Sequence, residues 1–203
     1  MNADSTDNAQ LQLVFNLPNL LTALRLALAG VMICFLAVEF YRTSFVLFIF
    51  AAATDWGDGY LARKYCQVTK LGRIFDPLAD KLIICGTFIM LAAVPEMNAV
   101  PWGLRPWMVV VIVGRELLVT ALRSFIEQRG GDFSARKSGK LKMFVQCLAA
   151  GVCLFYLACD TPESCWAGCL PTLLVGTVWA AVGLTIYSGL VYIWAAWKLL
   201  ARQ

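Results

Sequence analysis

One short part of the chain carries two closely spaced groups of carboxylates. It reads Asp55-Trp-Gly-Asp58-Gly59-Tyr-Leu-Ala62-Arg63 and, eight residues later, Gly72-Arg-Ile-Phe-Asp76-Pro-Leu-Ala-Asp80. Four of the 13 acidic residues therefore fall close together, between long apolar segments. A carboxylate in such surroundings is costly unless it is paired, bound to a metal or facing water. The stretch therefore predicts a site with a compensating charge, and a metal site explains it best.

The composition indicates an integral membrane protein. The chain has 203 residues, of which 60% are hydrophobic and only 15% are charged, whereas soluble domains average about 25% charged residues. We expect an all-α bundle of six transmembrane helices, with a polar, metal-containing cavity at its cytoplasmic end. Residues 1–15 are expected to form a polar tail leading into a juxtamembrane segment, and residues 16–203 a single membrane domain. No nucleic-acid partner is expected.

Six segments are long and apolar enough to span a hydrocarbon core, which takes about 20 residues per helix. These segments are Leu20–Phe40, Ser44–Arg63, Gly72–Val94, Trp107–Gln128, Ser138–Cys159 and Pro171–Leu200.

The basic residues between these segments predict the orientation. On one side of the membrane lie four at the second connection, five at the fourth connection and the edge of the helix that follows it, and two at the C-terminus (Lys198 and Arg202). On the other side lie Arg42 and Arg105. Because cytoplasmic loops are enriched in Lys and Arg, both termini and the aspartates are expected to face the cytoplasm. The same basic residues can also contact anionic membrane lipids.

The spacing of the aspartates places each pair on one helical face. Asp55 and Asp58 are three residues apart and Asp76 and Asp80 are four apart, and both separations bring side chains together on a helix. Four carboxylates from two neighbouring helices suit Mg²⁺ or Mn²⁺, and two such ions could clamp a phosphoryl group. The chain has no histidine, so a carboxylate is the best candidate for a general base.

Small residues surround the carboxylates. Gly59, Ala62 and Gly72 leave bare helix surface that a ligand can approach closely, although small residues also serve helix packing in membranes. Arg63 lies one turn beyond Gly59, where it can reach a phosphate.

The pattern D-x2-D-G-x2-A-R-x8-G-x3-D-x3-D resembles the signature of the CDP-alcohol phosphatidyltransferase family at every fixed position. The resemblance implies a six-helix, usually dimeric membrane enzyme that transfers a phosphatidyl group from a CDP-linked lipid to an alcohol and releases CMP. It implies two divalent metals on Asp55, Asp58, Asp76 and Asp80, with Asp80 also acting as general base. It further implies that the CDP moiety lies along Asp58, Gly59, Ala62, Arg63 and Gly72.

A group of cations in the second half of the chain indicates a second anionic substrate. Arg115 and Arg123 are two helical turns apart, and Lys140 and Lys142 begin the fifth segment. Four cations near the aspartate end favour a phosphate on the acceptor. The alternative for Arg115 is an ion pair with an acidic neighbour inside the bundle.

Three stretches resemble the bacterial branch of the family that makes phosphatidylglycerol phosphate. They are Asn16-Leu-Pro-Asn-Leu-Leu-Thr22-Ala-Leu-Arg25, Arg115-Glu-Leu-Leu-Val-Thr120-Ala-Leu-Arg123, and Gly139-Lys140-Leu-Lys142 with Gln146 four residues on. The resemblance implies CDP-diacylglycerol and sn-glycerol 3-phosphate as substrates and a bacterial inner-membrane location. Thr22, Arg25 and Thr120 are further candidates, and Arg25 could equally be a snorkelling anchor. The last segment carries no such stretch.

Other acceptors and another class of protein stay open at this point. A cardiolipin synthase of the same family would use phosphatidylglycerol, and related enzymes use serine or inositol phosphate. Intramembrane aspartates also serve ion carriers, but a carrier would spread them through the bilayer depth.

Overall fold

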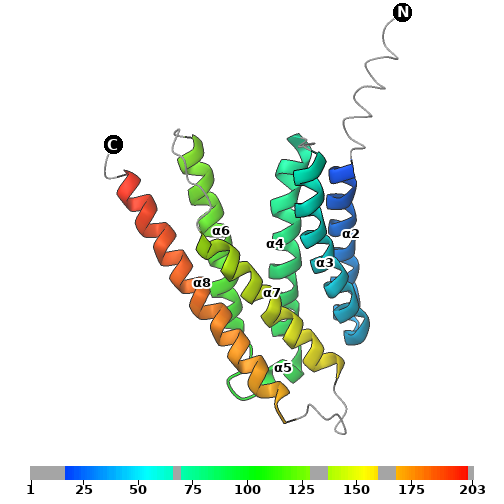
Figure 1. Cartoon of the computed structure of the whole chain (residues 1–203). Coiled ribbons are helices and arrows are strands. Elements are labelled where there is room, and N and C mark those ends of the chain that lie inside the picture. The colour runs from blue at the N-terminus through cyan, green and yellow to red at the C-terminus, as the bar shows by residue number, and fades with distance from the viewer. Residues whose placement is uncertain (1–16, 66–69, 129–136, 160–167, 201–203) are drawn as a thin grey trace, which may run out of the picture. The chain divides into compact units, whose positions relative to one another are not determined.

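The structure, a computed structural model, describes the backbone of residues 17–65, 70–128, 137–159 and 168–200. Side chains are described within these ranges except at 17–19, 21–22, 55–65, 70–80, 127–128, 137–140 and 199–200. The described ranges form helices and no strand (Figure 1). The helices are α2 (Leu17–Ala37), α3 (Tyr41–Tyr65), α4 (Lys70–Ala93), α5 (Pro95–Ala99), α6 (Pro106–Gln128), α7 (Lys137–Ala158) and α8 (Leu170–Leu200).

The all-helical prediction is confirmed, and the six long helices match the six predicted segments to within three residues at each end. The short helix α5 was not predicted. By length and apolar character, α7 and α8 can cross a membrane, over Leu141–Ala158 and Leu170–Lys198. Shorter apolar stretches lie in three other helices, at Ala23–Ala37, Tyr41–Thr54 and Lys81–Ala93. Six membrane spans therefore stay a prediction.

The chain forms two compact units, Met1–Gly86 and Thr87–Gln203. In the first unit α2 packs against α3. The contact face of α2 carries Ala29, Met32 and Leu36, which are buried and follow the helical repeat of three and four residues. A Cβ atom at Gly86 would lie 2.7 Å from Cδ1 of Ile33, so the end of this α2 side chain packs against the bare backbone of α4 there.

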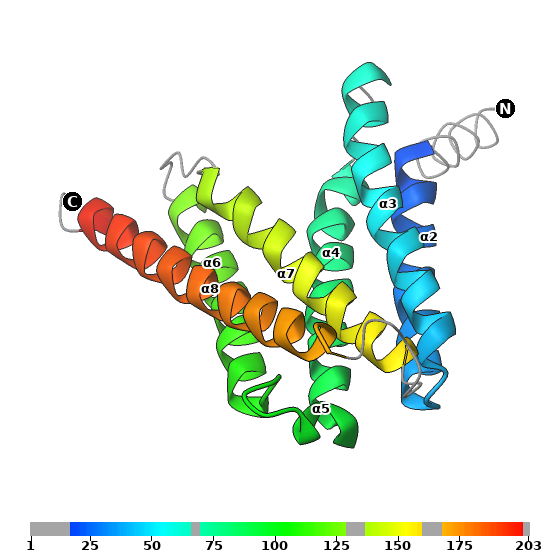
Figure 2. The same cartoon turned by 60° about the horizontal axis from the view of Figure 1, so that its bottom comes forward.

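In the second unit both α6 and α7 pack on α8. Figure 2 shows α7 running along α8, while Figure 1 shows α6 and α8 rising in the same direction and α7 descending. The C-terminal halves of α6 and α8 and the N-terminal half of α7 therefore belong to one end of this unit. In the sequence, the basic fourth connection joins the end of α6 to the start of α7, and Arg202 follows α8.

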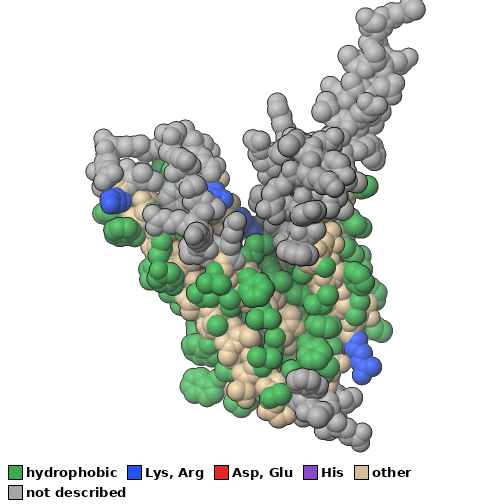
Figure 3. All heavy atoms as spheres, in the orientation of Figure 1, with side chains coloured by type: hydrophobic (Ala, Val, Ile, Leu, Met, Phe, Trp, Pro, Cys, Tyr) green, Lys and Arg blue, Asp and Glu red, His purple; other side chains and the backbone are tan. Residues whose placement is uncertain are grey.

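Hydrophobic side chains cover much of the described surface in Figure 3. In the second unit three exposed tryptophans gather near the start of α6 and α8. Nε1 of Trp179 donates a hydrogen bond to the carbonyl oxygen of Trp102 at 3.0 Å, and the rings of Trp107 and Trp179 meet edge to face at 6.0 Å. Tryptophans are enriched where membrane helices meet the interface, so this cluster fits the membrane boundary away from the basic end.

Candidate active site

The four aspartates of the predicted metal site lie on two consecutive helices. Asp55 and Asp58 are in the second half of α3, and Asp76 and Asp80 are in the first half of α4. A helix rises about 1.5 Å per residue, so Asp58 lies about 10 Å before the end of α3 and Asp76 about 10 Å after the start of α4. Asp55 and Asp80 lie about 15 Å from the same two ends. Each aspartate of α3 therefore has a counterpart on α4 at a similar distance from the helix end. Their side chains lie outside the described residues.

The predicted CDP-binding residues lie on the same two helix ends. Gly59, Ala62 and Arg63 belong to the last turns of α3, and Gly72 belongs to the first turn of α4. Two other candidates have a described backbone only: Thr22 in the second turn of α2 and Lys140 in the first turn of α7. What these side chains contact is outside the described part of the chain.

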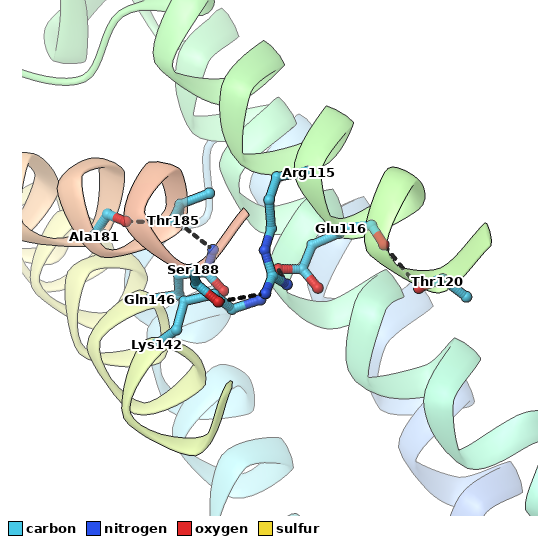
Figure 4. Close-up of polar contacts among 8 residues, drawn as sticks. All are labelled: Arg115, Glu116, Thr120, Lys142, Gln146, Ala181, Thr185 and Ser188. Atoms are coloured by element: carbon cyan, nitrogen blue, oxygen red, sulfur yellow. Dashed lines mark hydrogen bonds and ion pairs between the residues drawn. The ribbon is translucent and has the colours of Figure 1, made fainter. Parts of the chain in front are cut away.

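A second group of candidates is described atom by atom. Its side chains come from α6, α7 and α8, within the second unit, and meet around one guanidinium (Figure 4). We call this group the three-helix polar cluster; its members are Arg115, Glu116, Lys142, Gln146, Thr185, Ser188 and Tyr192.

The cluster interrupts an otherwise apolar core. Along the buried face of α8, Leu170, Leu174 and Val178 give way to Thr185, Ser188 and Tyr192 at the same helical spacing. The buried face of α7 changes in the matching sense, from Leu154 and Leu157 near its end to Gln146 and Lys142 near its start. Buried polar groups are costly unless their hydrogen bonds are made. Their concentration at one end of the unit indicates a functional site.

Arg115 is the centre of the cluster. Its Nη2 donates to Oγ of Ser188 at 2.6 Å, and its Nη1 donates to Oε1 of Glu116 at 3.3 Å. The ring of Tyr192 lies 5.3 Å from the guanidinium carbon, within the range of a cation–π contact. A Cβ atom at Gly189 would lie only 3.2 Å from Cγ of Arg115. The bare helix surface at Gly189 thus makes room for the arginine stem.

Glu116 links two cations. Its Oε1 atom accepts from Nζ of Lys142 as well as from Arg115, and the lysine side chain is only 6% exposed. Since Arg115 and Glu116 come from α6 and Lys142 from α7, one carboxylate oxygen connects two helices. The ammonium and the guanidinium are therefore held close together.

A neutral hydrogen-bond chain extends the cluster toward the apolar core. Nε2 of Gln146 donates to Oγ1 of Thr185 at 3.0 Å, and that hydroxyl donates to the carbonyl oxygen of Ala181 at 2.6 Å. This chain joins α7 to α8 one turn from Lys142 and Ser188. It satisfies a buried amide whose desolvation would otherwise be unfavourable.

One hydrogen-bond donor of Arg115 has no partner among the described residues. This donor is Nε, which is buried in a side chain that is only 9% exposed. An arginine binds a phosphate best through two parallel N–H groups, one of which is often Nε. The orphan donor beside Lys142 therefore suits an anion with several oxygens.

Three further candidates lie elsewhere on α6 and α2. Arg123 is half-buried on α6, two turns beyond Arg115. Thr120 is exposed, and its hydroxyl donates to the carbonyl oxygen of Glu116 at 2.7 Å. Arg25 is buried on the same face of α2 as Ala29, with 3% of its surface exposed. A snorkelling anchor would leave its charged end in solvent.

The contribution of α8 was missed in the sequence. Its three polar members are uncharged and scattered among apolar residues, so they add little to a hydropathy signal. Only their separations of three and four residues place Thr185, Ser188 and Tyr192 on one face. The sequence also left open an ion pair between Arg115 and an acidic neighbour. The structure contains this ion pair, and the neighbour is Glu116.

Comparison with known proteins identifies the family of the chain. The family model described as CDP-alcohol phosphatidyltransferase matches residues 15–187. The chain is 34% identical to a CDP-diacylglycerol–glycerol-3-phosphate 3-phosphatidyltransferase of Bacillus subtilis, covering 92% of this chain and 98% of the relative. It is also 34% identical to proteins of that name from Pseudomonas fluorescens (90% of each chain) and, as form 2, from Arabidopsis thaliana (94% and 83%). The chain therefore belongs to the CDP-alcohol phosphatidyltransferase family.

Proposed function

We propose that the protein transfers the phosphatidyl group of CDP-diacylglycerol to sn-glycerol 3-phosphate, giving phosphatidylglycerol phosphate and CMP. Family membership and the names of the relatives support the reaction. The observation that carries the choice of acceptor is Arg115, whose buried guanidinium keeps one donor without a partner among the described residues, beside Lys142. A phosphate monoester is the chemical group that such a pair suits best.

The aspartates of α3 and α4 are the proposed ligands for the metals that bind the nucleotide. Their all-oxygen donor set and their similar distances from the helix ends fit Mg²⁺ or Mn²⁺, and two ions would be held by Asp55, Asp58, Asp76 and Asp80. When bound, the metals neutralise charge on the pyrophosphate and on the departing CMP. Gly59, Ala62 and Gly72 leave space for the CDP moiety, and Arg63 offers it a charged donor.

The protein's own groups then complete the transfer. The primary hydroxyl oxygen of glycerol 3-phosphate attacks the phosphorus that bears diacylglycerol, and the bond from that phosphorus to the CMP oxygen breaks. The hydroxyl proton passes to the carboxylate of Asp80, which acts as the general base. Arg115, Lys142, Arg123 and Lys140 bind the acceptor phosphate and hold it in place, which lowers the entropic part of the barrier.

Arg25, Thr22 and Thr120 have supporting roles in this proposal. The burial of Arg25 on α2 supports an internal role near the anionic substrates rather than a lipid-facing one. Thr22 and Arg25 lie on one helix face, three residues apart. Thr120 lies on α6 between the two arginines.

We place the protein in a bacterial inner membrane with six spans, a cytoplasmic active site and a homodimeric state. The two long apolar helices and the family support the membrane location. The distribution of basic residues supports the cytoplasmic orientation. The family resemblance supports the dimer.

The direct test measures whether the acceptor becomes part of the lipid product. Purified protein in detergent is mixed with CDP-diacylglycerol, Mg²⁺ and glycerol 3-phosphate that is radiolabelled in its glycerol part. We expect the label to enter the lipid phase in step with CMP release, and no label without CDP-diacylglycerol. CMP release without transfer of the label to lipid would show that glycerol 3-phosphate is not the acceptor.

A further inference from the structure

Glu116 is a surprising neighbour for cations that bind phosphate. Its carboxylate is half-buried, with 14% of its side chain exposed, and lies within the three-helix polar cluster. A carboxylate beside a bound phosphate repels it, and burial strengthens that repulsion because screening is weak. A favourable effect of Glu116 must therefore come from what it does to the cations.

The contacts of Glu116 show such an effect. A single oxygen, Oε1, accepts from Nη1 of Arg115 and from Nζ of Lys142. A lysine stem has four rotatable bonds and an ammonium without directional preference, so it needs an anchor to stay in one place. The shared oxygen holds the ammonium of α7 next to the guanidinium of α6.

Arg115 is also fixed from the opposite side, by α8. Ser188 accepts from Nη2, and the ring of Tyr192 lies against the guanidinium. With Nη1 and Nη2 oriented by Glu116 and Ser188, the direction of the Nε–H bond is set as well, because the guanidinium is planar. Glu116 is thus the contact that relates the positions of both cations.

We propose that Glu116 is a positioning residue that sets the spacing of Arg115 and Lys142 for one phosphate monoester. The carboxylate touches neither the reacting phosphorus nor the attacking hydroxyl; it acts through the two cations. This inference rests on the proposed function, since it assumes that these cations bind the phosphate of the acceptor.

The test compares Glu116→Gln with Glu116→Asp. Glutamine keeps the shape but removes the charge that holds two cations, whereas aspartate keeps the charge on a shorter stem. The matched control is Glu96→Gln, an exposed glutamate of α5 away from the cluster. Steady-state KM is measured for glycerol 3-phosphate and for CDP-diacylglycerol separately, together with kcat and the melting temperature in detergent.

We expect Glu116→Gln to raise KM for glycerol 3-phosphate about tenfold, since the loss of a hydrogen bond to a charged group weakens binding by about tenfold or more. KM for CDP-diacylglycerol should stay unchanged, and Glu116→Asp should lie between wild type and Glu116→Gln. The control variant should match wild type in every constant.

Several results would overturn the inference. A lower KM for glycerol 3-phosphate in Glu116→Gln would show that the carboxylate only competes with the substrate. Equal rises in both KM values, or loss of folded protein in both variants, would show a purely structural role. A wild-type protein that does not use glycerol 3-phosphate would instead overturn the proposed function.

Discussion

Adding one methyl group at Gly189 should disturb the proposed acceptor site while leaving the rest of α8 unaffected. In Gly189→Ala the new Cβ would lie 3.2 Å from Cγ of Arg115, closer than an ordinary carbon–carbon contact. The arginine stem cannot yield freely, because its guanidinium is held by Ser188 and Glu116. The contact must therefore be relieved by moving the guanidinium.

The size of the effect follows from two opposing terms. Overpacking in a filled interior costs about 1–3 kcal/mol, and replacing glycine by alanine within a helix returns up to about 1 kcal/mol. The remainder, about 1 kcal/mol, corresponds to roughly a fivefold rise in KM for glycerol 3-phosphate when it falls on the position of Arg115. KM for CDP-diacylglycerol should not change.

The same helix offers a matched control. A Cβ atom at Gly183 would meet nothing within 4 Å among the described atoms, so Gly183→Ala should retain wild-type kinetics and have an equal or higher melting temperature. The assay measures CMP release against glycerol 3-phosphate concentration for both variants, with melting followed by intrinsic fluorescence. Identical kinetics for the two variants would refute the claim that α8 supports the acceptor site through Arg115.

Three further predictions concern single groups. Ser188→Ala removes a hydrogen bond to a charged donor and should raise KM for glycerol 3-phosphate about tenfold. Thr177→Ala is the control and should leave KM unchanged, because among the described contacts the hydroxyl of Thr177 bonds only to its own helix. Equal effects of the two substitutions would contradict the assigned role of Ser188. Asp80→Asn should leave the binding of CDP-diacylglycerol largely intact yet release no CMP, and substantial residual turnover would remove Asp80 as the base. A chelator should abolish CMP release and added Mg²⁺ or Mn²⁺ should restore it, while full activity in the chelator would exclude the metal site.

The helices were largely predictable from the sequence because apolar runs of about 20 residues are a strong signal. The exception is α5, where Pro95 begins a helix too short to show a period. The spacing of the aspartates was informative for a related reason. Residues three or four apart share a helix face, and α3 and α4 are helical at those positions.

The interior of the three-helix polar cluster was less predictable. The sequence left open an ion pair between Arg115 and an acidic neighbour, but adjacent residues do not face each other on a helix, and nothing in the sequence indicated that Glu116 would also meet Lys142 from another helix. That contact depends on long side chains bending toward a shared buried space. Likewise Ser188 gains its role only from the packing of α8 against α6.

The identity of the acceptor decides whether the proposed function holds, and an acceptor-specificity assay measures it. Purified protein in detergent, with CDP-diacylglycerol and Mg²⁺ or Mn²⁺, is offered glycerol 3-phosphate, phosphatidylglycerol, serine or inositol phosphate in turn, and CMP release is measured. We expect CMP release with glycerol 3-phosphate alone, at a lower rate in Arg115→Lys because lysine cannot form the paired hydrogen bonds of a guanidinium. CMP release with a different acceptor, at a rate that Arg115→Lys does not change, would overturn the proposed function.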